Sequence, residues 1–131
     1  MKQEEKQLLL QDLSARLPYK VQVEIQGFHS GVLRGIDNGT VSTDRGINYP
    51  LMFVKPYLRP MSSMTEDERE DFKSTEYEET ITQYPCSAAP TEIKVLSYTA
   101  KTFDWLNRKH FDYRGLIEKG LALEAPADMY K

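Results

Sequence analysis

The stretch Val21–Thr43, VQVEIQGFHSGVLRGIDNGTVST, decides the fold of this chain. Its first residues alternate between apolar and polar side chains, which is the pattern of a strand with one buried face. A second strand is expected at about Gly31–Ile36. Asn38-Gly39 follows it, the residue pair that a two-residue hairpin turn favours. Thr40–Thr43 then predicts a short third strand, so the stretch predicts an antiparallel meander.

The segments that flank this meander extend it to a small barrel. Before it, Lys2–Leu17 carries leucines at three- and four-residue spacing and ends at Pro18, which predicts a helix. After it, the apolar run Ile47–Val54 predicts a further strand. Lys55–Pro60 is expected to leave the barrel as an extended edge or connector, because each proline disfavours helical geometry in the residue before it. Four evenly spaced glycines permit sharp bends in these strands: Gly27, Gly31, Gly35 and Gly39.

The second half of the chain is expected to be mainly helical. Thr65 and Glu68 have the form of a capping box, which predicts the start of an acidic helix. Its few apolar anchors are Phe72 and Tyr77. One further strand is expected near Ile93–Leu96.

Two short helices are expected to end the chain. Thr102 is a suitable N-cap for the first, and Asp112 for the second, which Gly120 would end. The predicted fold is therefore α+β: an N-terminal helix, a small bent antiparallel β-barrel of the SH3 or Sm-like type, an acidic helix and two short C-terminal helices. With 131 residues, a single domain is expected, in which residues 61–131 pack as a helical extension on the helix and barrel of residues 1–60.

Charge is unevenly distributed along the chain. The segment Glu66–Glu79 holds eight acidic residues and two basic ones, a local charge of −6. Since the formal net charge is −3, the remainder carries +3. This balance gives no overall attraction to nucleic acid or anionic membranes, although a local basic face stays possible.

Several classes of site lack their sequence signature. Cys86 is the single cysteine, which excludes an intramolecular disulfide and a thiolate cluster. His29 and His110 are the two histidines, and neither lies in a metal-binding or catalytic motif. The N-terminal residues resemble neither a secretory signal nor a membrane span. We therefore expect a cytoplasmic protein without cofactor, metal, membrane contact or small-molecule substrate.

The segment Thr102–Pro126, TFDWLNRKHFDYRGLIEKGLALEAP, interleaves aromatic and basic residues. Such a pattern is typical of a nucleic-acid platform, in which rings stack on bases and cations contact phosphates. It also fits the buried and exposed faces of two helices, and we favour that interpretation. The candidate binding residues are Trp105, Arg108, Lys109 and Arg114, together with Arg59.

Two resemblances follow from these motifs. The leucine-rich helix, Val21–Ile25 and the segment Gly31–Asp37 (GVLRGID) resemble the start of the Sm-like family of RNA-binding small barrels. Lys55–Glu68 (KPYLRPMSSMTEDE) and Phe103–Pro126 resemble a family of short uncharacterised bacterial and prophage-type proteins. The first resemblance implies an RNA-binding ring, and the second implies an accessory protein of a mobile element.

The function expected from the sequence is non-enzymatic. We expect a binding or assembly accessory protein of a phage-like element, acting through protein partners, self-association or weak nucleic-acid contacts. The alternative is an Sm-like RNA-binding homo-oligomer, and a small hydrolase is a further alternative.

Overall fold

The computed structural model describes residues 2–37, 39–83, 91–98 and 100–130. Its elements divide into two compact units. Unit 1 comprises Met1–Ser63 and Leu106–Lys131, and unit 2 comprises Met64–Trp105. The chain thus leaves unit 1, forms unit 2 and returns to unit 1 at Leu106.

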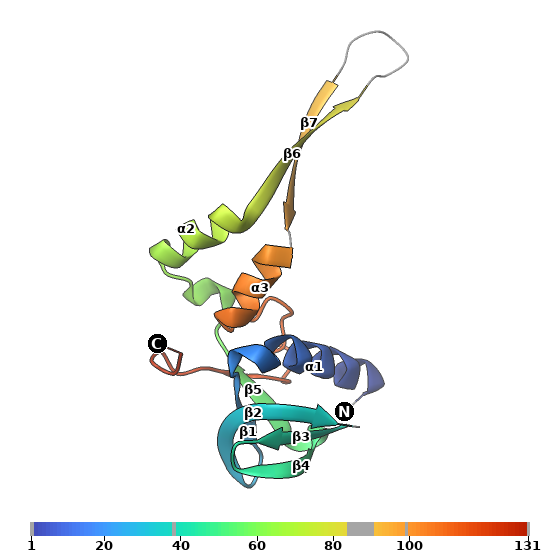
Figure 1. The fold of residues 1–131 in the computed structure, drawn as a ribbon, viewed down its shortest axis with the longest axis vertical. Coiled ribbons are helices and arrows are strands. Elements are labelled where there is room, and N and C mark those ends of the chain that lie inside the picture. Colours follow the sequence, from blue (N-terminus) through green and yellow to red (C-terminus); the bar gives the residue numbers. More distant parts are fainter. Residues whose placement is uncertain (1, 38, 84–90, 99, 131) are drawn as a thin grey trace. The chain divides into compact units, whose positions relative to one another are not determined.

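Unit 1 is built on one helix and a six-stranded sheet (Figure 1). The strand order is β4-β3-β2-β1-β5-β8; every neighbouring pair is antiparallel except β5 and β8, which run parallel. The sheet is open, with β4 and β8 at its edges. The elements are α1 (Gln3–Arg16), β1 (Gln22–Ile25), β2 (His29–Asp37), β3 (Thr40–Thr43), β4 (Gly46–Pro50), β5 (Val54–Leu58) and β8 (Leu123–Glu124).

The alternation predicted for β1 decides which face of the sheet is buried. Val23 and Ile25 are buried, whereas Gln22 and Glu24 are only half-buried on the opposite face. Helix α1 covers the buried face with Leu9 and other leucines, and each fully buried leucine contributes about 1.5–3 kcal/mol. The core comprises Leu9, Leu13, Val21, Val23, Ile25, Leu33, Val41, Leu51, Val54, Leu58, Leu116, Leu121 and Ala122.

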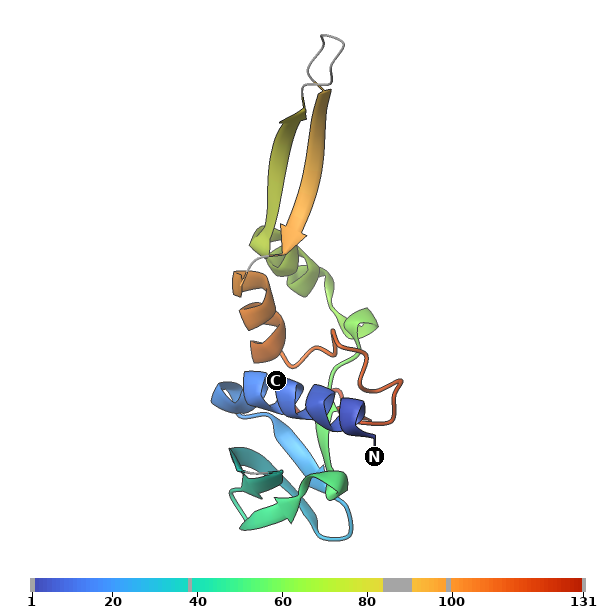
Figure 2. The same ribbon diagram turned by 90° about the vertical axis from the view of Figure 1, so that its right-hand side faces the viewer.

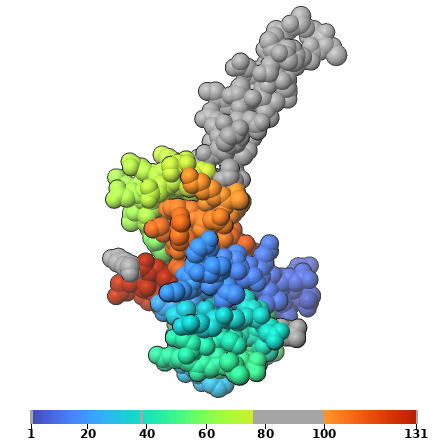
Figure 3. Space-filling view, viewed as in Figure 1, coloured from blue at the N-terminus to red at the C-terminus, as the bar shows by residue number. Residues whose placement is uncertain are grey.

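The helix and the first three strands confirm the sequence predictions to within a few residues. Figure 2 shows α1 lying across the strands of unit 1, and α1 and strands β2 to β4 are visible on one face of the space-filling view (Figure 3). The α+β class is therefore confirmed. In the described ranges, no helix is long and apolar enough to cross a bilayer.

The segment Lys55–Pro60 is mostly extended, as predicted, but most of it is a strand inside the sheet and not an edge or a connector. β5 pairs with β1 on one side and with β8 on the other. Pro56 is tolerated because the pairing with β8 begins only at Tyr57, so the missing N–H removes no hydrogen bond there. The apolar run before it is also divided: β4 ends at Pro50, and a 3-10 turn, Leu51–Phe53, leads into β5.

Unit 2 contains a helix, a two-stranded antiparallel hairpin and the first part, Ala100–Trp105, of a second helix. α2 (Glu66–Thr75) begins at the predicted capping box: the Thr65 N–H donates to Glu68 Oε1 at 3.1 Å, and the Glu68 N–H donates to Thr65 Oγ1 at 3.2 Å. β6 (Glu76–Gln83) and β7 (Thr91–Tyr98) pair along their whole length. β7 contains the predicted strand, but β6 was not predicted. Tyr77 was expected in the acidic helix and lies in β6 instead.

The two helices predicted for the C-terminal segment are replaced by one. α3 (Ala100–Arg108) encloses Thr102, whose hydroxyl donates to the Thr75 carbonyl instead of capping the helix. The predicted second helix is a series of turns. Asp112 accepts hydrogen bonds from two backbone N–H groups as a cap does, but Gly115 has a φ of +73°, a left-handed conformation that interrupts a helix.

Candidate binding surface

The residues predicted to bind nucleic acid do not form a stacking platform in the described structure. Trp105 is only 5% exposed, and its ring lies 5.8 Å from that of Phe72 in unit 2. Arg108, in unit 1, is exposed at the end of α3, and Lys109 is half-buried. The combination of one exposed ring with several exposed cations is therefore absent at these positions.

Arg114 and Arg59 have structural contacts within unit 1. Arg114 Nη1 donates to Asp12 Oδ1 at 2.7 Å, and its guanidinium lies 4.6 Å from the Tyr113 ring centroid. The Arg59 guanidinium lies 4.2 Å from the Phe111 ring centroid. These contacts attach the C-terminal segment to the rest of unit 1.

A buried polar cluster surrounds Asp12 on helix α1. The carboxylate is fully buried and also accepts a hydrogen bond from Arg16 Nε at 2.9 Å. Arg16, likewise fully buried, donates through Nη2 to the Phe111 carbonyl. A buried carboxylate with two guanidinium partners is satisfied, which explains why this charge is tolerated in the interior.

His110 lies in the same interior and stacks on Tyr130, with 4.0 Å between ring centroids. Burial, with a contribution from the Arg16 charge, lowers the pKa of His110 to about 4. Burial also raises the pKa of Tyr130 to about 12. The Tyr130 hydroxyl donates to the Tyr57 carbonyl at 2.7 Å and accepts from the Gln22 N–H at 3.0 Å. His110 is therefore a neutral packing residue near neutral pH, and Tyr130 fastens the C-terminus to β1 and β5.

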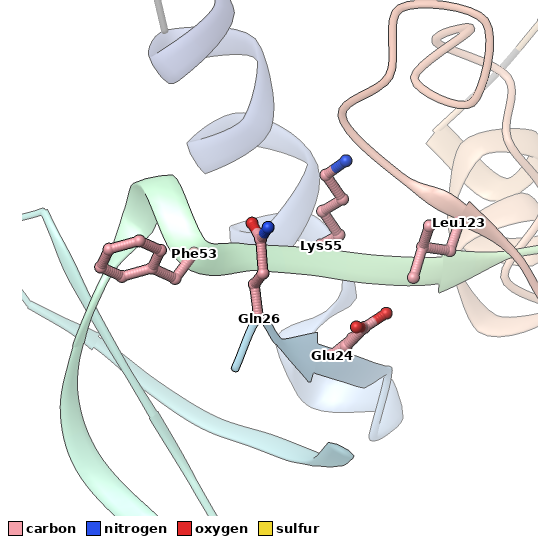
Figure 4. Close-up of a pocket in the computed structure, with 5 residues that line it drawn as sticks. All are labelled: Glu24, Gln26, Phe53, Lys55 and Leu123. Carbon is pink, nitrogen blue, oxygen red and sulfur yellow. The ribbon is translucent and has the colours of Figure 1, made fainter. Parts of the chain in front are cut away.

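The outer face of the sheet is a better candidate for a binding surface than the C-terminal residues. Two adjoining hollows lie there and share Glu24. The smaller, of about 140 Å³, is lined by Glu24, Gln26, Phe53, Lys55 and Leu123 and is drawn in Figure 4. The larger, of about 310 Å³, is lined by Glu24, Ile25, Gly27, Phe28, His29, Ser30 and Tyr57.

Aromatic side chains gather at the turn between β1 and β2, beside the larger hollow. The Phe28 and Tyr49 ring centroids are 5.7 Å apart, and His29 and Tyr49 make an edge contact at 5.4 Å. The hydroxyl groups of Ser30 and Tyr57 lie 3.3 Å apart, which fixes Tyr57 beside the same turn. The turn between β1 and β2 therefore presents aromatic rings and not the small polar residues usual in turns.

Several large apolar side chains of unit 1 are exposed, and two of them, Phe28 and Phe53, line the hollows. Phe28 is 68% exposed and Ile47 is 72% exposed, while Met52 and Phe53 are also exposed. Phe53 is next to the β1–β2 turn, because its carbonyl accepts a hydrogen bond from the Gln26 N–H at 2.7 Å. Sequence reasoning missed this group. The one sequence feature that indicated it was an aromatic residue next to a glycine in a turn, Gly27-Phe28.

No group of three or more His, Cys, Asp or Glu side chains in the described ranges is arranged to hold a metal ion. Cys86, the one thiol, lies outside those ranges.

Comparisons with protein-family models, with curated proteins and with solved structures find no match to this chain.

Proposed function

We propose that this chain is a non-enzymatic binding module that engages a protein partner through the outer face of β1 and β5 and the turns beside them. The observation that carries the proposal is the exposure of two large apolar side chains at the hollows: Phe28 lines the larger hollow and Phe53 lines the smaller. Gathered apolar exposure beside a hollow is typical of an interaction site, whereas single exposed apolar residues are ordinary.

The arrangement of elements supports an SH3- or Sm-like small barrel. A helix precedes a meander, a 3-10 turn precedes the fifth strand, and that strand returns to pair with the first. The role as an accessory protein of a phage-like element rests on the resemblance of Lys55–Glu68 and Phe103–Pro126 to prophage-type proteins.

An RNA-binding ring of the Sm-like kind is the competing proposal. Rings that form by strand addition need a free strand at each edge of the sheet. In this chain β8 covers the outer side of β5, so the edge there is a strand of only two residues, Leu123–Glu124, which offers little backbone for strand addition. We therefore favour a protein partner over ring assembly, and the oligomeric state in solution separates the two.

A displayed library of random peptides tests the proposal. The wild-type protein is panned, and enriched peptides are measured against wild type and against Phe28→Ser and Phe53→Ser. Exposed Phe103 of unit 2 supplies the control, Phe103→Ser. We expect peptides that lose at least about tenfold in affinity for the two hollow-facing variants and keep it for the control, as for anchors at the centre of an interface. Enriched peptides that bind all four proteins equally would refute the proposed surface, and so would a library that yields none.

A further inference from the structure

The larger hollow combines aromatic rings with a single charged side chain. Phe28, His29 and Tyr57 contribute rings, and Glu24 is the one charged residue that lines it. An aromatic face attracts a cation through its quadrupole, and a carboxylate adds a charge-assisted hydrogen bond. This lining therefore suits a positively charged group.

The strand register places these groups on one surface. Glu24 is opposite Ser30 across β1 and β2, and opposite Lys55 across β1 and β5. Tyr57 is two residues beyond Lys55, so its side chain projects from the same face as that of Glu24. The Ser30–Tyr57 contact of 3.3 Å holds the tyrosine at the rim of the hollow.

The Glu24 carboxylate is available to a partner. Lys55 is its nearest basic neighbour in the register, but the Lys55 ammonium points away from Glu24 (Figure 4). Among the residues that the structure describes, no ion pair involves Glu24. Its half-buried position beside Phe28 and Tyr57 lowers the local dielectric, which strengthens attraction to a cation.

We propose that this hollow binds the basic side chain of the protein partner, with Glu24 pairing to its charge and Phe28 and Tyr57 contacting its faces. Arginine fits best among basic side chains, because its planar guanidinium stacks on rings while its N–H groups donate to a carboxylate. The exposed side chain of Phe53, which lines the adjoining hollow, contacts the flanking part of the partner. This inference rests on the proposed function and names the chemistry of the partner.

Nuclear magnetic resonance titration of the 15N-labelled 131-residue chain provides a direct test. The probes are the blocked tripeptide Gly-Arg-Gly, the same peptide with neutral citrulline, and choline. We expect Gly-Arg-Gly to shift the amide signals of residues 24–30 and 57, and citrulline to bind at least about tenfold more weakly, because it lacks the charge. Equal binding of the citrulline peptide overturns the inference. Tighter binding of choline than of the arginine peptide overturns the assignment to a protein side chain.

Matched variants complete the test. Glu24→Gln keeps the shape and removes the charge, and Glu124→Gln on β8, which lines neither hollow, is its control. We expect Glu24→Gln to weaken Gly-Arg-Gly binding by about tenfold and Glu124→Gln to leave it unchanged. An unchanged affinity in Glu24→Gln refutes the inference.

The library separates this inference from the proposed function. Enriched peptides that depend on Phe28 but contain no basic residue leave the binding module standing and overturn the cation site. Conversely, the library can yield no peptide while the arginine peptide still binds in a way that depends on Glu24. That result overturns the proposed function and retains the cation site.

Discussion

Replacing Asp12 by asparagine should destabilise unit 1 strongly. The carboxylate is fully buried and pairs with Arg16 at 2.9 Å and Arg114 at 2.7 Å. Asparagine keeps nearly the same shape but leaves the fully buried Arg16 charge without a counter-charge. Removing one partner of a buried pair typically costs about 3–5 kcal/mol. Since a domain is stable by about 5–15 kcal/mol in total, the variant should be close to unfolding under mild conditions.

Urea unfolding followed by far-ultraviolet circular dichroism measures this loss. With a slope of about 1–3 kcal/mol per molar urea, a loss of this size lowers the midpoint by more than about 1 M. Arg114→Met is the comparison variant. Its side chain is 17% exposed, so it should cost clearly less than Asp12→Asn. The combined replacement Asp12→Leu with Arg16→Met removes both buried charges and should recover much of the stability. A free energy of unfolding for Asp12→Asn within about 1 kcal/mol of wild type would refute the reasoning, because the pair would then contribute little.

Three further outcomes follow from the contacts of unit 1 and unit 2. The pKa of His110 is lowered from 6.5 to about 4 in the folded state, so its contribution to stability is complete above pH 6.5 and is lost as the pH falls toward 4, by about 3 kcal/mol at most. The free energy of unfolding, plotted against pH between 7 and 4, should therefore fall less steeply for His110→Phe than for wild type, and equal slopes would contradict this. Tyr130→Phe removes two hydrogen bonds, to the Tyr57 carbonyl and from the Gln22 N–H, and should cost about 1–3 kcal/mol in urea unfolding, while an unchanged midpoint would contradict it. Thr65→Ala removes the cap of α2 and should reduce hydrogen-exchange protection in that helix by about 1 kcal/mol, whereas protection in β1 should stay the same.

The parts of the fold that were predicted from the sequence are those with a local cause. The alternation in Val21–Ile25 needs no distant partner, and neither does the reciprocal bonding of Thr65 and Glu68. β6 was missed because its sequence, EYEETITQ, is rich in charge and resembles the solvated helix that precedes it. The second C-terminal helix was predicted from apolar spacing, but the positive φ angle at Gly115 interrupts it.

The candidate site depends on long-range pairing, and for this reason most of it was not predictable. Asp12 is an ordinary polar residue on α1 until Arg114, 102 positions later, donates to it. Glu24 and Tyr57 share a face only because β1 pairs with β5 in one register. Arg114 was identified as a candidate for binding, but its contacts are internal. The exposed ring of Phe28 carries no periodic signal, since it lies in a turn.

The discontinuity of unit 1 has a consequence for biosynthesis. A ribosome releases the N-terminal helix and five strands long before Phe111, Leu116 and Leu121, which are all buried in unit 1. Until those residues emerge, the nascent sheet lacks part of its core, and the Asp12 carboxylate lacks Arg114. Unit 2 is contiguous in sequence, so it is free to fold first. Completion of unit 1 therefore waits until residues 106–124 have been synthesised, and a chain that ends before residue 111 lacks β8, the final strand of the sheet.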